Sequence, residues 1–352
     1  MFQIAMLPFD ELQREVNEKY YKRRGRKLYS DFKTFGSSDK IAHANAIEFY
    51  RMLADGELDG GSEITVYDFG IGNGLFSKFF LENFYELDGG KRQFVPRLSY
   101  FLCDISEELV KKAEKEMNRS GFKVEGIVCN ALGPLKFLKG ASYIRSNEMY
   151  DDLPAKIFVK EEDGNVSEVL MNEKMEKEYA PSRDNKKAIK KIMEKMPNGY
   201  EIPINYGARK HLEKCVSGLK KNGYVDIFDY GFGTVGEITA YPAEIWNNSI
   251  VREFNSQLTV DVNFIHLAHG LEAGAKAKIQ PQKQYAEQTL GEKLYYAEME
   301  QLYYLNGREL KANRKKMKKF GYPEDYAKRA AEKNIAKQIT ETDDYLHLRV
   351  WK

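Results

Sequence analysis

Val66-Tyr67-Asp68-Phe69-Gly70-Ile71-Gly72-Asn73-Gly74 is an apolar, strand-like run that contains one acidic residue and ends in three alternating glycines. Glycines at this spacing let the backbone turn tightly after a strand and approach a ligand without a Cβ in the way. The residues that follow, 75–81, supply a helix. The stretch therefore predicts a strand, a loop for a nucleotide-like ligand and a helix, which together form a β-α unit.

The glycine spacing distinguishes between kinds of cofactor loop. The dinucleotide fingerprint G-x-G-x-x-G needs a third glycine, but that position is Leu75 or, counted from Gly72, Ser77. The phosphate loop G-x-x-x-x-G-K-[ST] is absent as well. The remaining pattern, D-x-G-x-G-x-G, resembles the first motif of S-adenosylmethionine-dependent methyltransferases. The alternative is that these glycines only form a turn.

The composition is that of a large globular protein with balanced charge. Of the 352 residues, 42% are hydrophobic and 13% aromatic, which is ample for a core. The 55 basic and 53 acidic residues nearly cancel, so no net field favours nucleic acid or membrane. The sequence shows no secretory signal, no stretch of roughly 20 apolar residues that could span a bilayer, and three isolated cysteines. We expect a cytoplasmic protein without membrane insertion.

Strand-like and helix-like segments alternate along most of the chain. The expected strands are 64–69, 98–103, 124–129, 142–146, 224–230, 258–262 and 275–280. A helix capped by Ser106 follows the second strand, and another is expected near 264–271. Such alternation predicts a mostly parallel sheet with helices on both faces.

Further segments surround this sheet. About seventy residues separate the fourth and fifth strands, too many for a simple crossover, and we predict an insertion at about 155–200. Within it, Asp163-Gly164 predicts a hairpin turn, and the charged stretch 172–196 is helix-prone. The predicted regions are a helical N-terminal cap (1–60), the core with its insertion (61–285) and a helical C-terminal extension (286–352).

Polar residues follow the first five strands at their carboxyl ends, where an open α/β sheet binds its ligands. These residues are Asp68, Asp104, Asn130, Asn147, Glu148 and Asp229. Carboxylates and amides at such positions are difficult to attribute to packing. They are therefore candidates for a binding site.

A methyl donor would give several of these residues a role. Gly70, Gly72 and Gly74 would line its methionine and ribose parts, and Asp104 would accept hydrogen bonds from the ribose hydroxyls. Asp68 would orient the loop or the amino group of the donor. The remaining residues of the expected cofactor site are Ile105, Asn130, Ala131 and Asn147. For Asp104 the alternative is a solvated aspartate at a helix N-terminus.

The end of the fourth strand, residues 146–154, is the second informative segment. It lacks the N-P-P-[YF] pattern of enzymes that methylate exocyclic base amines. Instead it offers Glu148 with Asp151 and Asp152, and paired carboxylates suit a planar, cationic guanidinium. We predict Glu148 and Asp151 as catalytic residues that hold one nitrogen in line with the donor methyl group. The alternative is a solvated acidic turn.

Several separated segments resemble the MidA-like methyltransferases, a family that includes the mitochondrial complex I assembly methyltransferase. The resemblance covers roughly residues 20–290, and the N-E-x-x-D-x-L-P and D-Y-G segments are its most specific motifs. The matching segments are Tyr29-Ser30-Asp31-Phe32 with Thr34, Asp68 to Gly74, Cys103-Asp104-Ile105-Ser106, Asn147-Glu148 with Asp151 and Leu153-Pro154, Asp229-Tyr230-Gly231, and Thr259-Val260-Asp261-Val262-Asn263-Phe264.

The resemblance implies a Rossmann-like class I methyltransferase sheet with S-adenosylmethionine as donor and S-adenosylhomocysteine as product. It also implies protein arginine methylation, because the mitochondrial member methylates an arginine of a respiratory complex subunit. Asp68 and Asp104 depart from the family, which more often has glutamate at both positions. The last sixty residues match no pattern of the family.

Basic runs at 19–27 and 314–319 leave other partners open, although such runs are more often solvated faces than nucleic-acid sites. His266 and His269 could share a helix face, but no further metal ligands can be placed, and no metal is expected. Three hypotheses follow: a protein arginine methyltransferase, an RNA or small-molecule methyltransferase, and a cofactor-binding assembly factor with little turnover.

Overall fold

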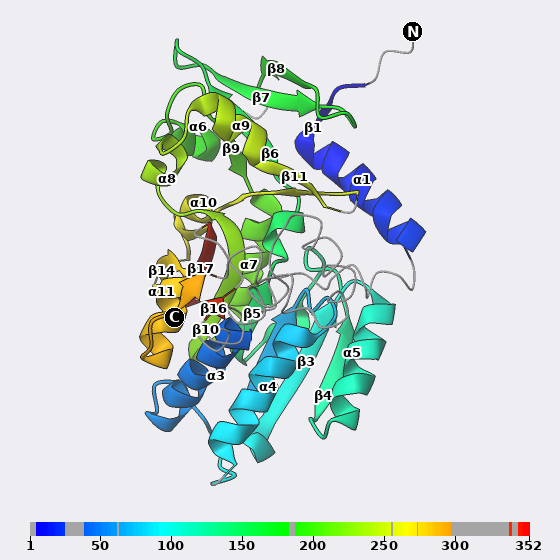
Figure 1. Cartoon of the computed structure of the whole chain (residues 1–352), viewed down its shortest axis with the longest axis vertical. Helices are drawn as coiled ribbons and strands as arrows, with labels where there is room; N and C mark the ends of the chain where they lie inside the picture. Colours follow the sequence, from blue (N-terminus) through cyan, green and yellow to red (C-terminus); the bar gives the residue numbers. More distant parts are fainter. Residues whose placement is uncertain are drawn as a thin grey trace, which may run out of the picture.

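The computed structural model describes residues 5–24, 39–61, 63–89, 91–182, 187–254, 256–272, 274–296, 338–339 and 344–352. Two main sheets, two pairs of short strands and the surrounding helices make up the described part of the molecule (Figure 1). The Tyr29 to Thr34 motif and the basic run 314–319 lie outside the described residues.

The large sheet has the strand order β14-β17-β10-β5-β2-β3-β4, with β13 paired to β10. Neighbours from β4 to β10 are parallel, whereas β17 is antiparallel to both β10 and β14. The predicted Rossmann-like α/β fold is confirmed. The strands are β2 (Ile64–Phe69), β3 (Leu98–Asp104), β4 (Val124–Val128), β5 (Ala141–Asn147), β10 (Leu219–Phe232), β13 (Val262–Asn263), β14 (Lys276–Pro281) and β17 (Tyr345–Trp351).

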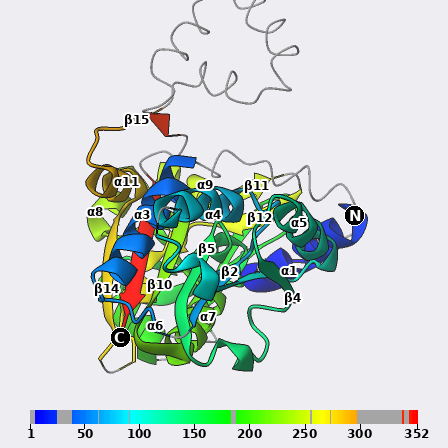
Figure 2. The same cartoon turned by 90° about the horizontal axis from the view of Figure 1, so that it is seen from below.

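Helices cover both faces of this sheet (Figure 2). Alternate residues of a strand point to opposite faces, so Val66 of β2 packs against α3, α4 and α5 while Tyr67 packs on the side of α7 and α10. Ser106 caps α5 as predicted, and its side chain accepts a hydrogen bond from the Leu109 N–H. The helices are α3 (Asp39–Ala54), α4 (Leu75–Asp88), α5 (Glu107–Arg119), α7 (Tyr206–Gly218), α10 (Phe264–Ala268) and α11 (Gln282–Leu290).

The strand order changes direction at β2. The chain runs from β2 outward to β3 and β4, and then returns to the other side of β2 with β5 and β10. Loops at the carboxyl ends of β2 and β5 therefore leave in opposite directions and open a crevice between them. Both the glycine loop and the acidic turn lie at this point.

The smaller sheet has the order β1-β7-β6-β9, with β8 paired to β7, and it contains the predicted hairpin, β6 with β7. The charged stretch 172–196 is only partly helical, because β8 within it pairs with β7 and this pairing outweighs the local helix preference. The elements are β1 (Leu7–Pro8), α1 (Phe9–Arg24), β6 (Lys156–Lys160), β7 (Val166–Met171), β8 (Lys177–Pro181), α6 (Lys187–Met193), β9 (Glu201–Ile204), α8 (Val235–Thr239) and α9 (Ala243–Ser249).

The prediction of a helical chain from Tyr285 to the end is wrong for the last residues. α11 ends at Leu290, and β17 is a strand in the interior of the large sheet. Its Leu346, Leu348 and Val350 are buried in the core, as alternating apolar positions of a strand require. The remaining elements are β11 (Val251–Phe254), β12 (Gln257–Val260), β15 (Tyr295–Tyr296), β16 (Gln338–Ile339), η2 (Val95–Arg97), η3 (Lys136–Leu138) and η4 (Tyr150–Asp152).

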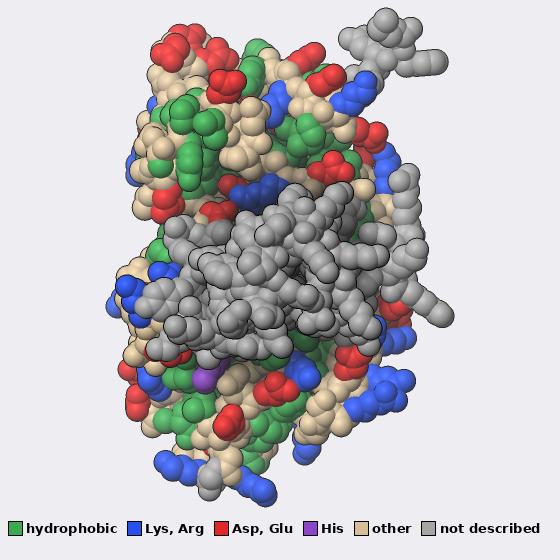
Figure 3. All heavy atoms as spheres, in the orientation of Figure 1, with side chains coloured by type: hydrophobic (Ala, Val, Ile, Leu, Met, Phe, Trp, Pro, Cys, Tyr) green, Lys and Arg blue, Asp and Glu red, His purple; other side chains and the backbone are tan. Residues whose placement is uncertain are grey.

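Acidic, basic and hydrophobic side chains are intermixed on the described part of the surface in Figure 3. This distribution agrees with the near-zero net charge of the sequence. Among the described residues, no helix combines the length and the apolar character needed to cross a membrane.

Candidate active site

A cavity of about 500 Å³ lies at the carboxyl edge of the large sheet. On one side it is lined by the glycine loop, and on the other by the acidic turn after β5, by Tyr230 and by the β11–β12 hairpin. The predicted site residues that line it are Asp68, Gly70, Gly72, Asn147, Glu148 and Asp151. The cavity therefore joins the two segments that the sequence singled out.

The glycine loop has a backbone that only glycine adopts readily. Gly70, Gly72 and Gly74 have φ angles of 67°, 52° and 76°. A Cβ on Gly70 would lie 2.7 Å from Met149 Cβ, and one on Gly74 would lie 2.9 Å from Met117 Cε. Gly70 thus lets the acidic turn pack directly on the loop, while Gly74 lets α4 begin close to α5.

Asp68 anchors the loop through a buried ion pair that the sequence did not reveal. Its Oδ2 accepts hydrogen bonds from Ser77 Oγ at 2.5 Å, Tyr100 OH at 2.6 Å and Arg145 Nη2 at 2.6 Å. The Arg145 side chain is fully buried, and its Nη1 donates to Asn45 Oδ1. Asp68 therefore lines the cavity from a position that several elements fix.

Asp104 lies against the glycine loop, although it does not line the cavity. Its carboxylate accepts hydrogen bonds from the N–H groups of Gly72, at 3.4 Å, and Ser106, at 2.9 Å. Burial raises the pKa of Asp104 to about 6, although these backbone donors lower it. Its role toward a ribose remains a prediction.

Four other predicted cofactor residues do not line the cavity. Gly74 supports the start of α4, and Ile105, next to Asp104, is 60% exposed. Asn130 accepts a hydrogen bond from the Leu132 N–H at 2.8 Å and shapes the turn that contains Ala131. Their contacts with a cofactor remain predictions.

The acidic turn is held in a strained conformation. Glu148 has a φ of 47°, which is uncommon for a residue with a side chain, and its N–H donates to Phe228 O at 2.8 Å. Asp229, at the end of the fifth predicted strand, accepts hydrogen bonds from the N–H groups of Met149 and Tyr150. Asp229 thus shapes the turn, and burial raises its pKa well above the ordinary value.

Asp151 and Asp152 follow on this turn, and one carboxylate oxygen of each accepts a hydrogen bond. Asp151 Oδ2 accepts a hydrogen bond from Tyr230 OH at 2.7 Å, and Asp152 Oδ2 accepts one from Gln257 Nε2. Asp151 Oδ1 and Asp152 Oδ1 are buried and receive no hydrogen bond from the described residues. Burial raises the pKa of both carboxyl groups, and the nearby Asp151 adds to the shift of Asp152.

The β11–β12 hairpin faces the glycine loop across the cavity. The sequence analysis expected a strand at 258–262, which overlaps β12, but it missed β11. Arg252 lies with its Cζ 4.2 Å from the Tyr230 ring centroid and forms ion pairs with Asp261 and Asp344. The helix α1 holds the other strand, because Asn17 exchanges two hydrogen bonds with the backbone of Leu258. Thus the N-terminal helix braces the site from outside.

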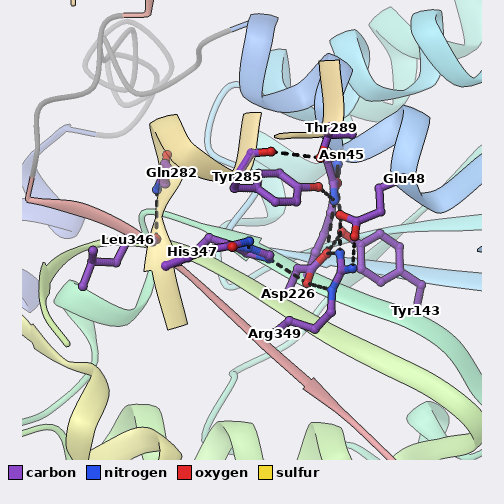
Figure 4. Close-up of polar contacts among 12 residues, drawn as sticks. Asn45, Glu48, Tyr143, Asp226, Gln282, Tyr285, Thr289, Leu346, His347 and Arg349 are labelled. Atoms are coloured by element: carbon purple, nitrogen blue, oxygen red, sulfur yellow. Dashed lines mark hydrogen bonds and ion pairs between the residues drawn. The ribbon is translucent and has the colours of Figure 1, made fainter. Parts of the chain in front are cut away.

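Asp344 and Tyr345 also line the cavity, and the sequence analysis missed them. The network in Figure 4 fixes β17, the strand that begins at Tyr345. Asp226 of β10 is bound by His347 Nε2 at 2.8 Å, by two nitrogens of Arg349 at 2.7 Å and by Asn45, while Arg349 also contacts Glu48. Burial alone would raise the pKa of Asp226, but Arg349 and His347 hold it below its ordinary value. The alternating Tyr345-Leu346-His347-Leu348-Arg349-Val350-Trp351 pattern could have predicted this strand.

Comparisons with known proteins identify the class of this site. A family model described as "Putative S-adenosyl-L-methionine-dependent methyltransferase" matches residues 45–281, more than half of the chain. The protein is a methyltransferase that depends on S-adenosylmethionine. It belongs to the family of that model, the MidA-like family, and the predicted family is confirmed.

Solved structures agree on the fold. An uncharacterized protein from Burkholderia thailandensis has 16% identity and a TM-score of 0.62, over 99% of this chain and 87% of that one. A "likely methyl transferase" from Burkholderia thailandensis bound to S-adenosyl-homocysteine has 15% identity and a TM-score of 0.60, over 99% and 88%. No curated protein matches the chain.

The residues of the cavity fit this cofactor. The backbone of the glycine loop faces the cavity without Cβ atoms at Gly70 and Gly72. Asp68 and Asn147 supply polar groups on the same wall, and Asp104 lies behind Gly72. S-adenosylmethionine is thus the methyl donor, as predicted.

Proposed function

We propose that this methyltransferase transfers a methyl group to a guanidino nitrogen of an arginine in a protein partner. One observation carries the proposal. Asp151 Oδ1 and Asp152 Oδ1 are buried without a donor from the described residues, and they belong to side chains that line the same cavity as the glycine loop. A buried carboxylate oxygen without a donor is costly, and a cation with several N–H groups would satisfy both.

The charge of the cavity supports a cationic acceptor. Glu148, Asp151, Asp152 and Glu253 line it. Among the lining residues that the structure describes, the one basic side chain is Arg252, which is already paired with Asp261 and Asp344. A guanidinium would reverse the raised pKa of Asp151 and Asp152, because a nearby cation favours the ionised carboxylate. Acceptor binding is therefore expected to release protons and to strengthen as the pH rises.

The chain's own residues would orient and deprotonate the acceptor. Bound S-adenosylmethionine supplies an electrophilic methyl group. Glu148 and Asp151 would bind the N–H groups of the guanidinium and turn one nitrogen toward that methyl group. A carboxylate of this cluster would accept the proton that the nitrogen gives up as it gains the methyl group.

Glu148→Gln tests this assignment. It removes one charge and retains the shape of the side chain, so methyl transfer should be lost while the affinity for S-adenosylhomocysteine changes less than about threefold. The matched control is Glu244→Gln, which removes an exposed charge outside the cavity and should retain most activity. Transfer would be followed with a labelled methyl donor in host lysate, with mass spectrometry of the products. Activity that survives Glu148→Gln would refute the catalytic role, and labelled RNA without labelled protein would refute the arginine acceptor.

A further inference from the structure

Tyr230 of the D-Y-G segment has no role in the function described so far, yet its hydroxyl lies at the centre of the acidic site. The side chain is 7% exposed and lines the cavity. Its hydroxyl lies 2.7 Å from Asp151 Oδ2 and 2.5 Å from Thr259 Oγ1. Three segments that are distant in sequence thus meet at one oxygen atom.

The single proton of this hydroxyl determines the direction of the hydrogen bonds. An ionised Asp151 can only accept, so Tyr230 donates to Asp151 Oδ2 and Thr259 donates to the Tyr230 oxygen. This arrangement occupies Oδ2 and leaves Oδ1, the oxygen without a donor among the described residues, for a ligand. It also favours the ionised form of Asp151, against the effect of burial.

The ring of Tyr230 is fixed as well. Arg252 lies over one face of the ring at 4.2 Å, and its ion pairs with Asp261 and Asp344 hold the guanidinium in place. Thr259 pairs with Arg252 across the β11–β12 hairpin, so both neighbours of Tyr230 come from the same hairpin. A hydroxyl held in this way would keep Asp151 in one orientation without reorganisation during the reaction.

We propose that Tyr230 is a positioning residue that, together with Thr259, holds Asp151 ionised and oriented toward the methyl acceptor. This inference rests on the proposed function in one respect, namely that the acidic turn faces the transferred methyl group. It does not depend on which cationic acceptor the protein uses.

A donor analogue tests the inference without the acceptor. Sinefungin carries a cationic amine where S-adenosylmethionine carries its methylsulfonium group, whereas S-adenosylhomocysteine is neutral there. The full-length protein should prefer sinefungin to S-adenosylhomocysteine in calorimetric titrations, and this preference should grow with pH as Asp151 ionises. Tyr230→Phe should reduce the preference about fivefold to tenfold and move its rise to higher pH, with the S-adenosylhomocysteine affinity unchanged.

Thr259→Val should change the preference in the same direction by a smaller factor, and it provides a second test if Tyr230→Phe does not fold. The control is Tyr206→Phe. This variant removes the 2.9 Å hydrogen bond from Tyr206 to Asp10, which lies outside the cavity, and it should change the affinity for neither analogue. An unchanged preference and pH profile in both cavity variants would overturn the role of Tyr230. Absence of any preference in the wild type would overturn the orientation of Asp151. If the protein prefers sinefungin but no arginine is labelled in the lysate experiment, only the proposed acceptor is rejected.

Discussion

The two ends of the cavity differ in how their polar groups are satisfied. At the donor end, Asp68 Oδ2 receives three hydrogen bonds and a buried arginine neutralises its charge. At the acceptor end, Asp151 and Asp152 each leave one buried oxygen without a donor from the described residues, and Glu148 has a strained backbone. The charge at the proposed donor end is thus balanced within the protein, although Arg145 Nε has no hydrogen-bond partner among the described residues. The proposed acceptor end leaves two carboxylate oxygens that a cationic ligand would satisfy.

The difference extends to what each end does for stability. A satisfied buried ion pair costs the protein little as long as both partners remain, but an unpaired buried charge is strongly destabilising. Carboxylates without donors already carry part of that cost in the free protein, as the raised pKa values of Asp151 and Asp152 indicate. The same substitution, aspartate to asparagine, should therefore have opposite effects at the two ends.

The largest effect is expected at the donor end. Asp68→Asn leaves the Arg145 guanidinium, fully buried, without its charge partner, and we expect the free energy of unfolding to fall by about 3 kcal/mol or more. Denaturant titration with urea measures this quantity. Glu107→Gln removes an exposed ion pair with Lys111 and should leave the stability almost unchanged. Equal effects of the two substitutions would show that the Asp68 pair is not an anchor of the loop.

The donor end could be predicted from the sequence because its residues are contiguous. The glycine loop, β2 and the start of α4 form one local unit, and the positive φ angles explain why glycine occupies each alternate position. Even here Arg145 was missed, because a basic residue inside a predicted strand carries no signal that it pairs with Asp68 on the neighbouring strand. Local patterns do not encode cross-strand partners.

The acceptor end could be predicted only in part. Glu148, Asp151 and Asp152 stood out as an acidic turn, but their side of the cavity is completed by Arg252, Gln257 and other residues about one hundred positions later. Asp344 and Tyr345 were missed because the C-terminal segment was predicted to be helical, whereas residues Tyr345–Trp351 form a strand. The site is thus assembled by tertiary contacts, such as α1 on β12, that no single segment specifies.

A smaller effect, of opposite sign, is expected at the acceptor end. Asp152→Asn keeps an oxygen that can accept from Gln257 and removes a carboxylate whose pKa is raised well above its ordinary value by burial. Because the pKa of Asp152 is raised in the folded protein, the wild type loses stability as the pH rises and the carboxyl group ionises. Asparagine does not ionise, so the variant should equal or exceed the wild type in stability at pH 8. The KM for an arginine peptide should rise about tenfold. Destabilisation by more than about 1 kcal/mol in the same urea titration would remove the contrast between the two ends.

The smallest effect concerns the pH dependence of donor binding. Asp104 has a pKa of about 6, and its ionised form is the better acceptor for two ribose hydroxyls. Affinity for S-adenosylhomocysteine should therefore rise as the pH increases from 5 to 7 and level off above that, by less than about tenfold in total. The contribution of Asp104 to protein stability should fall as the pH rises. Its carboxyl group has a higher pKa in the folded protein than in the unfolded chain, so the folded state is favoured below about pH 4, and this stabilisation is lost as the pH passes 6. Asp104→Asn should flatten both profiles, and calorimetry across this range would check them. A wild-type affinity that does not change between pH 5 and 7 would mean that Asp104 does not bind the ribose and only holds the turn before α5 through the Ser106 N–H.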